Sequence, residues 1–317
     1  MVSAGLSPRE AVRRVETRLA AAGCPDADYD ARELVRAASG RDARLSDRVL
    51  TTEEAEKLEA LCTRREQREP LQYLCGIWSF LDFDLAVGPG VLCPRADTEV
   101  VAEAAAGMLA GVEAPQVLDL CAAPGGKSTQ IAALTGDTGL LWSNEVVRNR
   151  AAILSSNLER MGVRNTVVSS VYPEMLAEKL GGYFDKVLVD APCSGEGMFR
   201  RDPVAVQEWS PEHVETCAVR QLAILSSAAQ CVREGGILVY STCTFSTEEN
   251  EGVVQKFLES HPEFVLEKPN VTFGRPAYGV DAVRIFPMDG GEGHFAARFR
   301  RVAPCEERFA PFSFKPD

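Results

Sequence analysis

Hydrophobic residues in the first part of the chain recur every three to four positions, the spacing of amphipathic helices. The first helix is predicted to begin at SPRE (Ser7–Glu10), a capping box with proline at the first helical position. Two more helices are predicted over residues 26–38 and 51–67, the second with a threonine cap and early acidic residues. We therefore expect residues 1–75 to form a small helical domain.

The pattern then changes from helical spacing to alternation. WSFLDFDLAV (78–87) alternates as a strand does, and the GPG turn (88–90) and VLCP (91–94) that follow predict a short β-hairpin. DTEVVAEAAAGMLAG (97–111) starts with an aspartate cap and predicts a helix. Residues 76–113 should thus connect the helical domain to the rest of the chain.

From Gln116 onward, short apolar runs alternate with amphipathic stretches. This order predicts an α/β fold with a doubly wound, mostly parallel sheet over residues 114–301, followed by a tail (302–317). The expected strands cover residues 116–120, 139–145, 165–170, 184–190 and 235–241, with closing strands at 263–267 and 294–301. The expected helices cover residues 125–136, 148–162, 173–181, 211–234 and 247–261.

Charge sets limits on the partners. The 317 residues carry a net charge of −12, shared evenly: residues 1–113 hold 14 basic and 20 acidic side chains, and residues 114–317 hold 20 and 26. This balance argues mildly against nucleic acid, because phosphate contacts need lysine and arginine, so any RNA would bind through a local groove. The start of the chain is charged and no apolar run could span a bilayer, so we expect no membrane and a cytoplasmic location.

Two of the ten cysteines stand out by their position. Cys193 follows the strand-like run KVLVD and Cys243 follows ILVY, so both thiols should point into the ligand crevice at the carboxyl ends of the strands. Two thiols in one cleft suit a disulfide, a metal or covalent attack. The chain has no CxxC pair and three scattered histidines, so we expect no metal, and cytoplasmic thiols stay reduced. We expect most of the other cysteines to be small, buried hydrophobic side chains, namely Cys24, Cys62, Cys75, Cys93, Cys217, Cys231 and Cys305.

The first strand-to-helix turn, DLCAAPGGK (119–127), indicates a cofactor site. Its glycine pair lets backbone approach a ligand at a helix N-terminus, but it matches neither GxGxxG nor GxxxxGK[ST]. Glu145, at the end of the second strand, suits a ribose diol, or it could simply cap the next helix. Together these features favour a nucleoside cofactor such as S-adenosylmethionine.

Several motifs together resemble a known enzyme family. DLCAAPGGKST, NE, DAPCSGEGMFRRDP, WSPE and STCTFSTEENE occur in the order seen in the Nop/Sun family of RNA (cytosine-5) methyltransferases, most similar to its bacterial ribosomal-RNA branch. The resemblance covers roughly residues 114–301. It implies a class I fold that binds S-adenosylmethionine and forms 5-methylcytosine in RNA, with rRNA the first candidate and tRNA the second.

The first third resembles a different family. Residues 68–103 are similar to the N-terminal region of the release-factor glutamine methyltransferases, and this likeness extends over roughly residues 1–113. That family carries NPPY where this chain reads DAPC, so we follow the catalytic part. Two alternatives stay open: a glutamine methyltransferase acting on release factors, and a cofactor-binding module without turnover whose helical domain docks a protein partner.

The Nop/Sun resemblance also implies roles for individual residues. Carbon 5 of cytosine is a poor nucleophile, and adding a thiolate at carbon 6 activates it. By resemblance Cys243 is this nucleophile, and Cys193 assists its release. Asp190 would hold ring nitrogen 3 and the exocyclic amine, donating a proton there, or else cap a turn. Lys127 would orient Asp190 or the substrate, or else lie in solvent.

The expected cofactor site also reaches the neighbouring strands and helices. Arg150 would either face the cofactor or have a structural role, and the adenine ring would bind backbone groups near Ser170 and Val171. The predicted cofactor-binding residues are Cys121, Ala122, Ala123, Pro124, Gly125, Gly126, Lys127, Glu145, Arg150 and Asp190.

Overall fold

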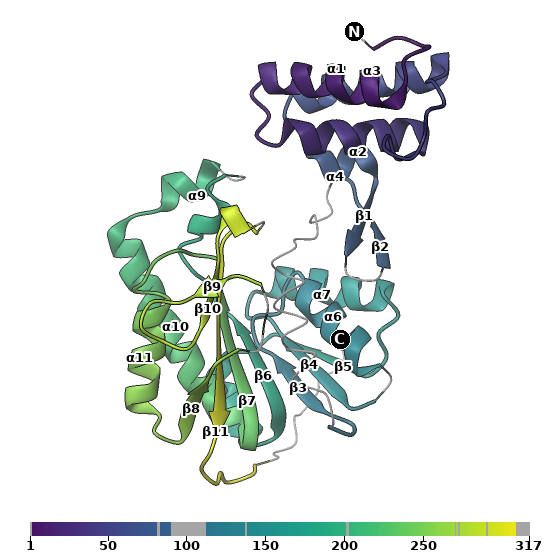
Figure 1. Cartoon of the computed structure of the whole chain (residues 1–317). Helices are drawn as coiled ribbons and strands as arrows, with labels where there is room; N and C mark the ends of the chain where they lie inside the picture. The colour runs from purple at the N-terminus through teal and green to yellow at the C-terminus, as the bar shows by residue number, and fades with distance from the viewer. Residues whose placement is uncertain are drawn as a thin grey trace. The chain divides into compact units, whose positions relative to one another are not determined.

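The chain divides into two compact units, Met1–Pro94 and Arg95–Asp317. The predicted helix at 97–111 lies outside the described residues. The computed structural model (Figure 1) describes residues 2–80, 83–89, 112–136, 138–200, 203–269, 271, 273–289 and 291–308.

The first unit is helical, as its hydrophobic spacing predicts. Both predicted caps form: Ser7 and Glu10 make a capping box, and so do Thr51 and Glu54. The apolar face of each long helix is buried in one core, which includes Leu19, Leu34 and Leu58. The helices are α1 (Pro8–Ala21), α2 (Ala27–Ser39), α3 (Thr52–Glu66) and the short α4 (Leu71–Cys75).

A hairpin forms within the alternating run 78–87. Strands β1 (Ile77–Phe80) and β2 (Phe83–Ala86) are antiparallel, and Phe80 pairs with Phe83. The predicted strand VLCP (91–94) and the last residue of the GPG turn lie outside the described residues. The Ser79 hydroxyl donates to Asp84 Oδ1 across the pair (2.6 Å), a polar contact that favours this register.

The second unit is built on one nine-stranded sheet. The strand order is β5-β4-β3-β6-β7-β11-β10-β9, with β8 also paired to β11. Strands β3 to β7 are parallel, and β8 to β11 add antiparallel pairs at one side. The strands are β3 (Gln116–Asp119), β4 (Leu140–Asn144), β5 (Thr166–Ser169), β6 (Phe184–Asp190), β7 (Val232–Thr242), β8 (Phe264–Glu267), β9 (Arg275–Pro276), β10 (Val283–Ile285) and β11 (His294–Arg301).

Helices follow the strands as the sequence predicts. The long ones are α6 (Gly126–Thr135), α7 (Arg148–Arg160), α10 (Pro211–Cys231) and α11 (Glu251–Ser260). The shorter α8 (Pro173–Lys179) was also predicted, whereas α9 (Pro203–Glu208), the 3₁₀ turns η1 (Glu196–Met198) and η2 (Pro287–Asp289), and strands β9 and β10 were not. These missed elements are too short for periodicity to detect.

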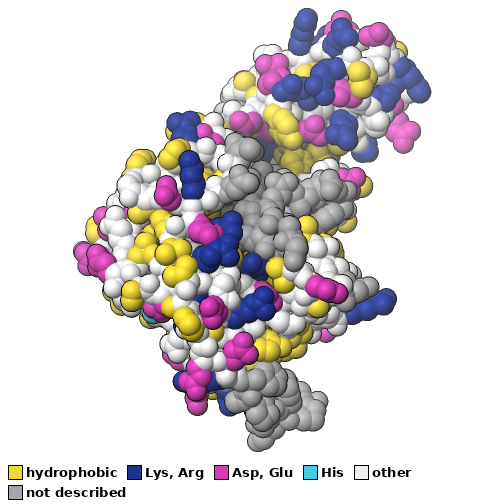
Figure 2. Space-filling model, turned by 60° about the horizontal axis from the view of Figure 1, so that its bottom comes forward, with side chains coloured by type: hydrophobic (Ala, Val, Ile, Leu, Met, Phe, Trp, Pro, Cys, Tyr) yellow, Lys and Arg dark blue, Asp and Glu magenta, His cyan; other side chains and the backbone are white. Residues whose placement is uncertain are grey.

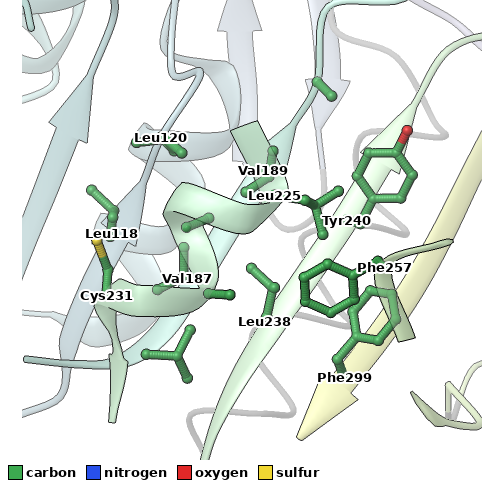
Figure 3. Close-up of a cluster of buried hydrophobic side chains, with 14 of the residues drawn as sticks. Leu118, Leu120, Val187, Val189, Leu225, Cys231, Leu238, Tyr240, Phe257 and Phe299 are labelled. Carbon is green, nitrogen blue, oxygen red and sulfur yellow. The ribbon is translucent and has the colours of Figure 1, made fainter. Parts of the chain in front are cut away.

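Alternate residues of the central strands pack on opposite faces of the sheet. Val187 and Leu238 belong to the large core under α8, α10 and α11, part of which is drawn in Figure 3. Leu188 and Val239 belong to a second core with Ile131 of α6. Both faces are thus covered, which explains why these strands are continuously apolar rather than alternating.

The order of the strands reverses beside β3. From β3 the chain proceeds outward to β4 and β5, and then returns to place β6 on the other side of β3. Ligands of doubly wound sheets bind at the carboxyl ends of the strands where this order reverses. Asp119 ends β3 and Asp190 ends β6, so both lie at this switch point.

Candidate active site

The turn after β3 is shaped to leave backbone exposed to a ligand. Gly125 has a φ of 111°, a left-handed conformation that favours glycine, and a Cβ there would lie 3.0 Å from Leu154 Cδ1. At Gly126, which begins α6, a Cβ would meet no atom within 4 Å. A ligand can therefore approach the N-terminus of α6 closely.

Helix α7 holds this turn in place. Arg150 donates from Nη2 to the Ala123 carbonyl (2.9 Å), and Asn157 donates from Nδ2 to the Pro124 carbonyl (2.7 Å). These two side chains lie seven residues apart, on one face of the helix. Arg150 therefore holds the backbone of the predicted loop. Asn157 does the same and was not predicted from the sequence.

Glu145 forms a contact at the start of the next helix, which is one of the two roles predicted for it. It is buried, its Oε1 accepts from the Val147 amide (3.0 Å) at the start of α7, and its Oε2 lies 3.3 Å from Arg150 Nη1. The capping contact predicted for Glu145 is thus present. The carboxylate follows the end of β4, and its contact with a ribose stays a prediction.

The backbone at Val171 is already hydrogen-bonded in this structure. Asn144 Nδ2 donates to the Val171 carbonyl (3.0 Å), and the Val171 amide donates to Asn144 Oδ1 (3.2 Å). The Val171 amide is therefore already bonded to Asn144, and a contact of adenine with backbone groups near Ser170 and Val171 stays a prediction. Asn144 was missed because it reads as an ordinary strand end.

Asp190 lies in a network of polar groups. Lys127 Nζ is 2.7 Å from Asp190 Oδ2, the Ser241 hydroxyl donates to Oδ1 (2.8 Å), and His294 Nε2 lies 3.8 Å from Oδ1. Burial alone would raise the pKa of Asp190, but Lys127 and His294 hold it below its usual value. Burial likewise opposes the charge of Lys127, yet Asp190 raises the pKa of Lys127 above its usual value.

Two conclusions follow from this network. Asp190 accepts hydrogen bonds from Lys127 and Ser241, and its lowered pKa favours the ionised form; proton donation by Asp190 to the base stays a prediction. Lys127 is not a solvated lysine but the partner that keeps this carboxylate charged. His294 had no signal in the sequence, because a single histidine in an apolar strand is usually a core residue.

The structure brings the two predicted cysteines together. Strands β6 and β7 are parallel neighbours with Asp190 opposite Ser241, and the Sγ atoms of Cys193 and Cys243 lie 3.3 Å apart. The contact with Cys243, together with burial, raises the pKa of Cys193 well above its usual value. The two sulfurs are thus within hydrogen-bonding distance, and the raised pKa favours a protonated Cys193 beside Cys243.

Glu196 links the loops that follow these cysteines. Its Oε2 accepts from the Phe245 amide (2.9 Å), and its Oε1 accepts from Trp209 Nε1 (2.9 Å). Nearby, the Gly197 amide donates to the Cys243 carbonyl (2.9 Å), and a Cβ on Gly197 would stand 2.8 Å from that same oxygen. Close backbone contact here therefore requires glycine.

Within the ranges that the structure describes, no group of three or more His, Cys, Asp or Glu side chains is placed to hold a metal ion. Among the same residues, no helix is long and apolar enough to cross a bilayer.

Comparison with solved structures defines the class of fold. NSun6 from Pyrococcus horikoshii, solved with SFG, superimposes with a TM-score of 0.57 and 34% identity over 64% of this chain and 52% of that one. With the crevice described above, the second unit is a class I methyltransferase fold. The model of the 16S rRNA methyltransferase RsmB/F family matches residues 106–300, and this chain belongs to that family.

Curated relatives agree with this membership. A ribosomal RNA small subunit methyltransferase F from Erwinia tasmaniensis is 42% identical over 199 residues, which are 61% of this chain and 42% of that protein. Its Vibrio cholerae counterpart is 42% identical over 192 residues, 59% and 41% of the two chains. The chain thus spans less than half the length of these relatives. Residues 10–76 match a different model, the PrmC N-terminal domain, as the resemblance of the first third predicted.

Proposed function

We propose that this protein is an S-adenosylmethionine-dependent methyltransferase that forms 5-methylcytosine in RNA through a covalent bond to Cys243. The observation that carries the proposal is the pair of thiols 3.3 Å apart at the ends of β6 and β7, beside the Lys127–Asp190 ion pair. A glutamine methyltransferase would need neither thiol, so the matched N-terminal domain does not outweigh this site.

Residues of this chain fit the cofactor. Open space at Gly126 and the N-terminus of α6 accommodate its charged end, and Glu145 is placed for the ribose hydroxyls. NSun6 was solved with SFG, an analogue of S-adenosylmethionine, which supports the same assignment. When bound, S-adenosylmethionine supplies a methyl group on a sulfonium. The loop residues 121–127, with Glu145, Arg150 and Asp190, form or support this proposed site.

The first step activates the base. The Cys243 thiolate adds to carbon 6 of cytosine, and the electrons of the C5–C6 double bond move toward carbon 5, which can then take the methyl group. Asp190, ionised beside Lys127, accepts a hydrogen bond from the exocyclic amine and orients the ring. Because the target carbon must enter the crevice, the base has to leave its stack.

The last step releases the product. The proton on carbon 5 passes to solvent, the C5–C6 double bond re-forms, and the bond between Cys243 and carbon 6 breaks. Cys243 leaves as a thiolate, and the protonated Cys193 stabilises it by a hydrogen bond. This gives the two cysteines different protonation states and different roles.

The names of the relatives favour ribosomal RNA of the small subunit as the substrate. The net charge of −12 and the mixing of Lys and Arg with Asp and Glu on the face drawn in Figure 2 indicate that binding relies on local contacts. We further propose a cytoplasmic location. We place the catalytic domain at residues 114–301, the helical domain at 1–75, the connection at 76–113 and the tail at 302–317.

A methylation assay with defined RNAs tests the proposal. The protein is incubated with labelled S-adenosylmethionine and 16S rRNA, small subunits, or tRNA, and nucleosides are identified by mass spectrometry. We expect 5-methylcytidine in ribosomal RNA with wild type and none with Cys243→Ala. Methylation of another base, or undiminished activity in Cys243→Ala, would overturn the covalent mechanism.

A further inference from the structure

Glu249 lies at the junction of the two cysteine loops. It is fully buried, just before α11, and its Oε2 accepts from the Ser194 amide (3.0 Å) and from Gln221 Nε2 (2.7 Å). Gln221 Nε2, on α10, also donates to the Pro192 carbonyl (2.9 Å). The residues on either side of Cys193 are thus both held by the Glu249–Gln221 pair.

The residue next to Glu249 holds the other cysteine in the same manner. Asn250 Nδ2 donates to the Thr244 carbonyl (3.0 Å), and the Thr242 hydroxyl donates to Asn250 Oδ1 (2.6 Å). These contacts bracket Cys243. Consecutive residues therefore each fix one thiol by its two flanking residues.

Glu249 is itself anchored to the rigid sheet. Its carbonyl accepts from the buried Tyr240 hydroxyl (2.7 Å) on β7, and its amide donates to Ser246 Oγ (3.2 Å). The carboxylate does not face solvent, and among described residues only neutral amide groups donate to it. Burying a carboxyl group costs free energy unless the group is hydrogen-bonded. Here one hydrogen bond comes from the Cys193 loop itself, and the other comes from Gln221, which also binds that loop.

We propose that Glu249 is a positioning residue that holds the Cys193 thiol against Cys243 and thereby governs release of the methylated base. This inference rests on the proposed function for its catalytic part. Its geometric part, the spacing of the two sulfurs, holds with or without RNA. Loss of Glu249 should let the Cys193 loop move, so that attack by Cys243 continues while release slows.

The first measurement needs no RNA. Diamide removes two hydrogens from the paired thiols and is reduced to its hydrazine as an S–S bond forms, and alkylation with peptide mapping reports the Cys193–Cys243 disulfide. We expect this rate to fall at least about tenfold in Glu249→Ala, as the loss of two hydrogen bonds implies, and to recover largely in Glu249→Gln, which keeps an acceptor oxygen. Glu248→Gln, at the exposed neighbouring position, should match wild type.

The second measurement follows the covalent complex. On ordinary RNA, Glu249→Ala should accumulate the protein–RNA adduct that Cys193→Ala accumulates, while wild type should not. Gln221→Leu, a milder change, should shift both readouts in the same direction and serves if Glu249→Ala does not fold. A purely structural role would instead lower the melting temperature and reduce attack and release together.

The outcomes separate this inference from the proposed function. The positioning role would be overturned if folded Glu249→Ala forms the disulfide at the wild-type rate. If Glu249→Ala does not fold, the same result in Gln221→Leu would overturn it. If wild type forms no adduct even with 5-fluorocytosine RNA, the proposed function fails. The diamide result still decides the positioning role in that case.

Discussion

Removing one member of the buried Arg284–Glu251 pair should destabilise the catalytic unit strongly. Arg284 on β10 is 1% exposed and forms two hydrogen bonds with Glu251, the first residue of α11, one of them Nε to Oε1 at 2.7 Å. Its Nη1 also donates to the Phe245 carbonyl (3.0 Å), two residues after the proposed nucleophile. The pair thus connects β10 and α11 to the loop that carries Cys243.

The expected magnitude follows from these contacts. Arg284→Met leaves a buried carboxylate whose other donor is the Tyr278 amide (3.0 Å), a situation that costs about 3–5 kcal/mol of unfolding free energy. The unpaired Phe245 carbonyl adds roughly 1 kcal/mol. Replacing both charges, in Arg284→Met with Glu251→Leu, leaves no uncompensated charge. It should cost only about 1–3 kcal/mol, because the Tyr278 amide and the Phe245 carbonyl lose their partners.

A double-mutant cycle by urea unfolding measures this coupling. Arg284→Lys keeps the charge but loses the two-pronged contact, and should fall between wild type and Arg284→Met. We expect the summed losses of unfolding free energy in the two single variants to exceed the loss in the double variant by at least about 3 kcal/mol. Additive losses, or a cost under about 1 kcal/mol for Arg284→Met, would refute the reasoning that a buried charge dominates here.

Other regions give independent predictions. Burial raises the pKa of Asp119 to about 6, so between about pH 4 and 6 the folded state holds a proton that the unfolded state has lost. The free energy of unfolding should therefore fall by about 3 kcal/mol as pH rises through this window. Unfolding experiments between pH 3 and 7 should show this fall in wild type and not in Asp119→Asn. An unchanged profile would contradict this. Gly293→Ala should lower the free energy of unfolding by at least about 2 kcal/mol, because φ is 119° and the new Cβ would lie 2.5 Å from Phe245 Cζ. A melting temperature equal to that of wild type would contradict this, because it would mean that the loop relaxes without strain. Asn157→Ala should weaken cofactor binding about fivefold in calorimetry by freeing the Pro124 carbonyl, and equal affinity would remove Asn157 from the support of the turn.

The fold and the cysteine pair could be predicted because they follow from local patterns. Continuous apolar runs after turns identify buried parallel strands, and two such strands that lie side by side bring their carboxyl ends together. Cys193 and Cys243 meet for this reason, although they are fifty residues apart in sequence. The pairing of β1 with β2 inside one alternating run could not be predicted, because alternation alone does not mark where a chain reverses.

The polar residues that support the site could not be predicted. Gln221 lies on a long amphipathic helix, where a glutamine is expected to face solvent, yet it is fully buried and bonded to Glu249. His294 is likewise buried, near Asp190, and its partner lies more than a hundred positions away. Such contacts depend on packing between distant segments, which periodicity does not record.

Trapping the covalent complex tests the central claim most directly. Wild type, Cys243→Ala and Cys193→Ala are incubated with S-adenosylmethionine and RNA bearing 5-fluorocytosine, whose fluorine cannot leave as a proton, and run on a denaturing gel. We expect a protein–RNA band with wild type that is absent from Cys243→Ala, and a band with ordinary RNA for Cys193→Ala. A band that persists in Cys243→Ala, or no band with any RNA despite measured cofactor binding, would contradict covalent catalysis by Cys243.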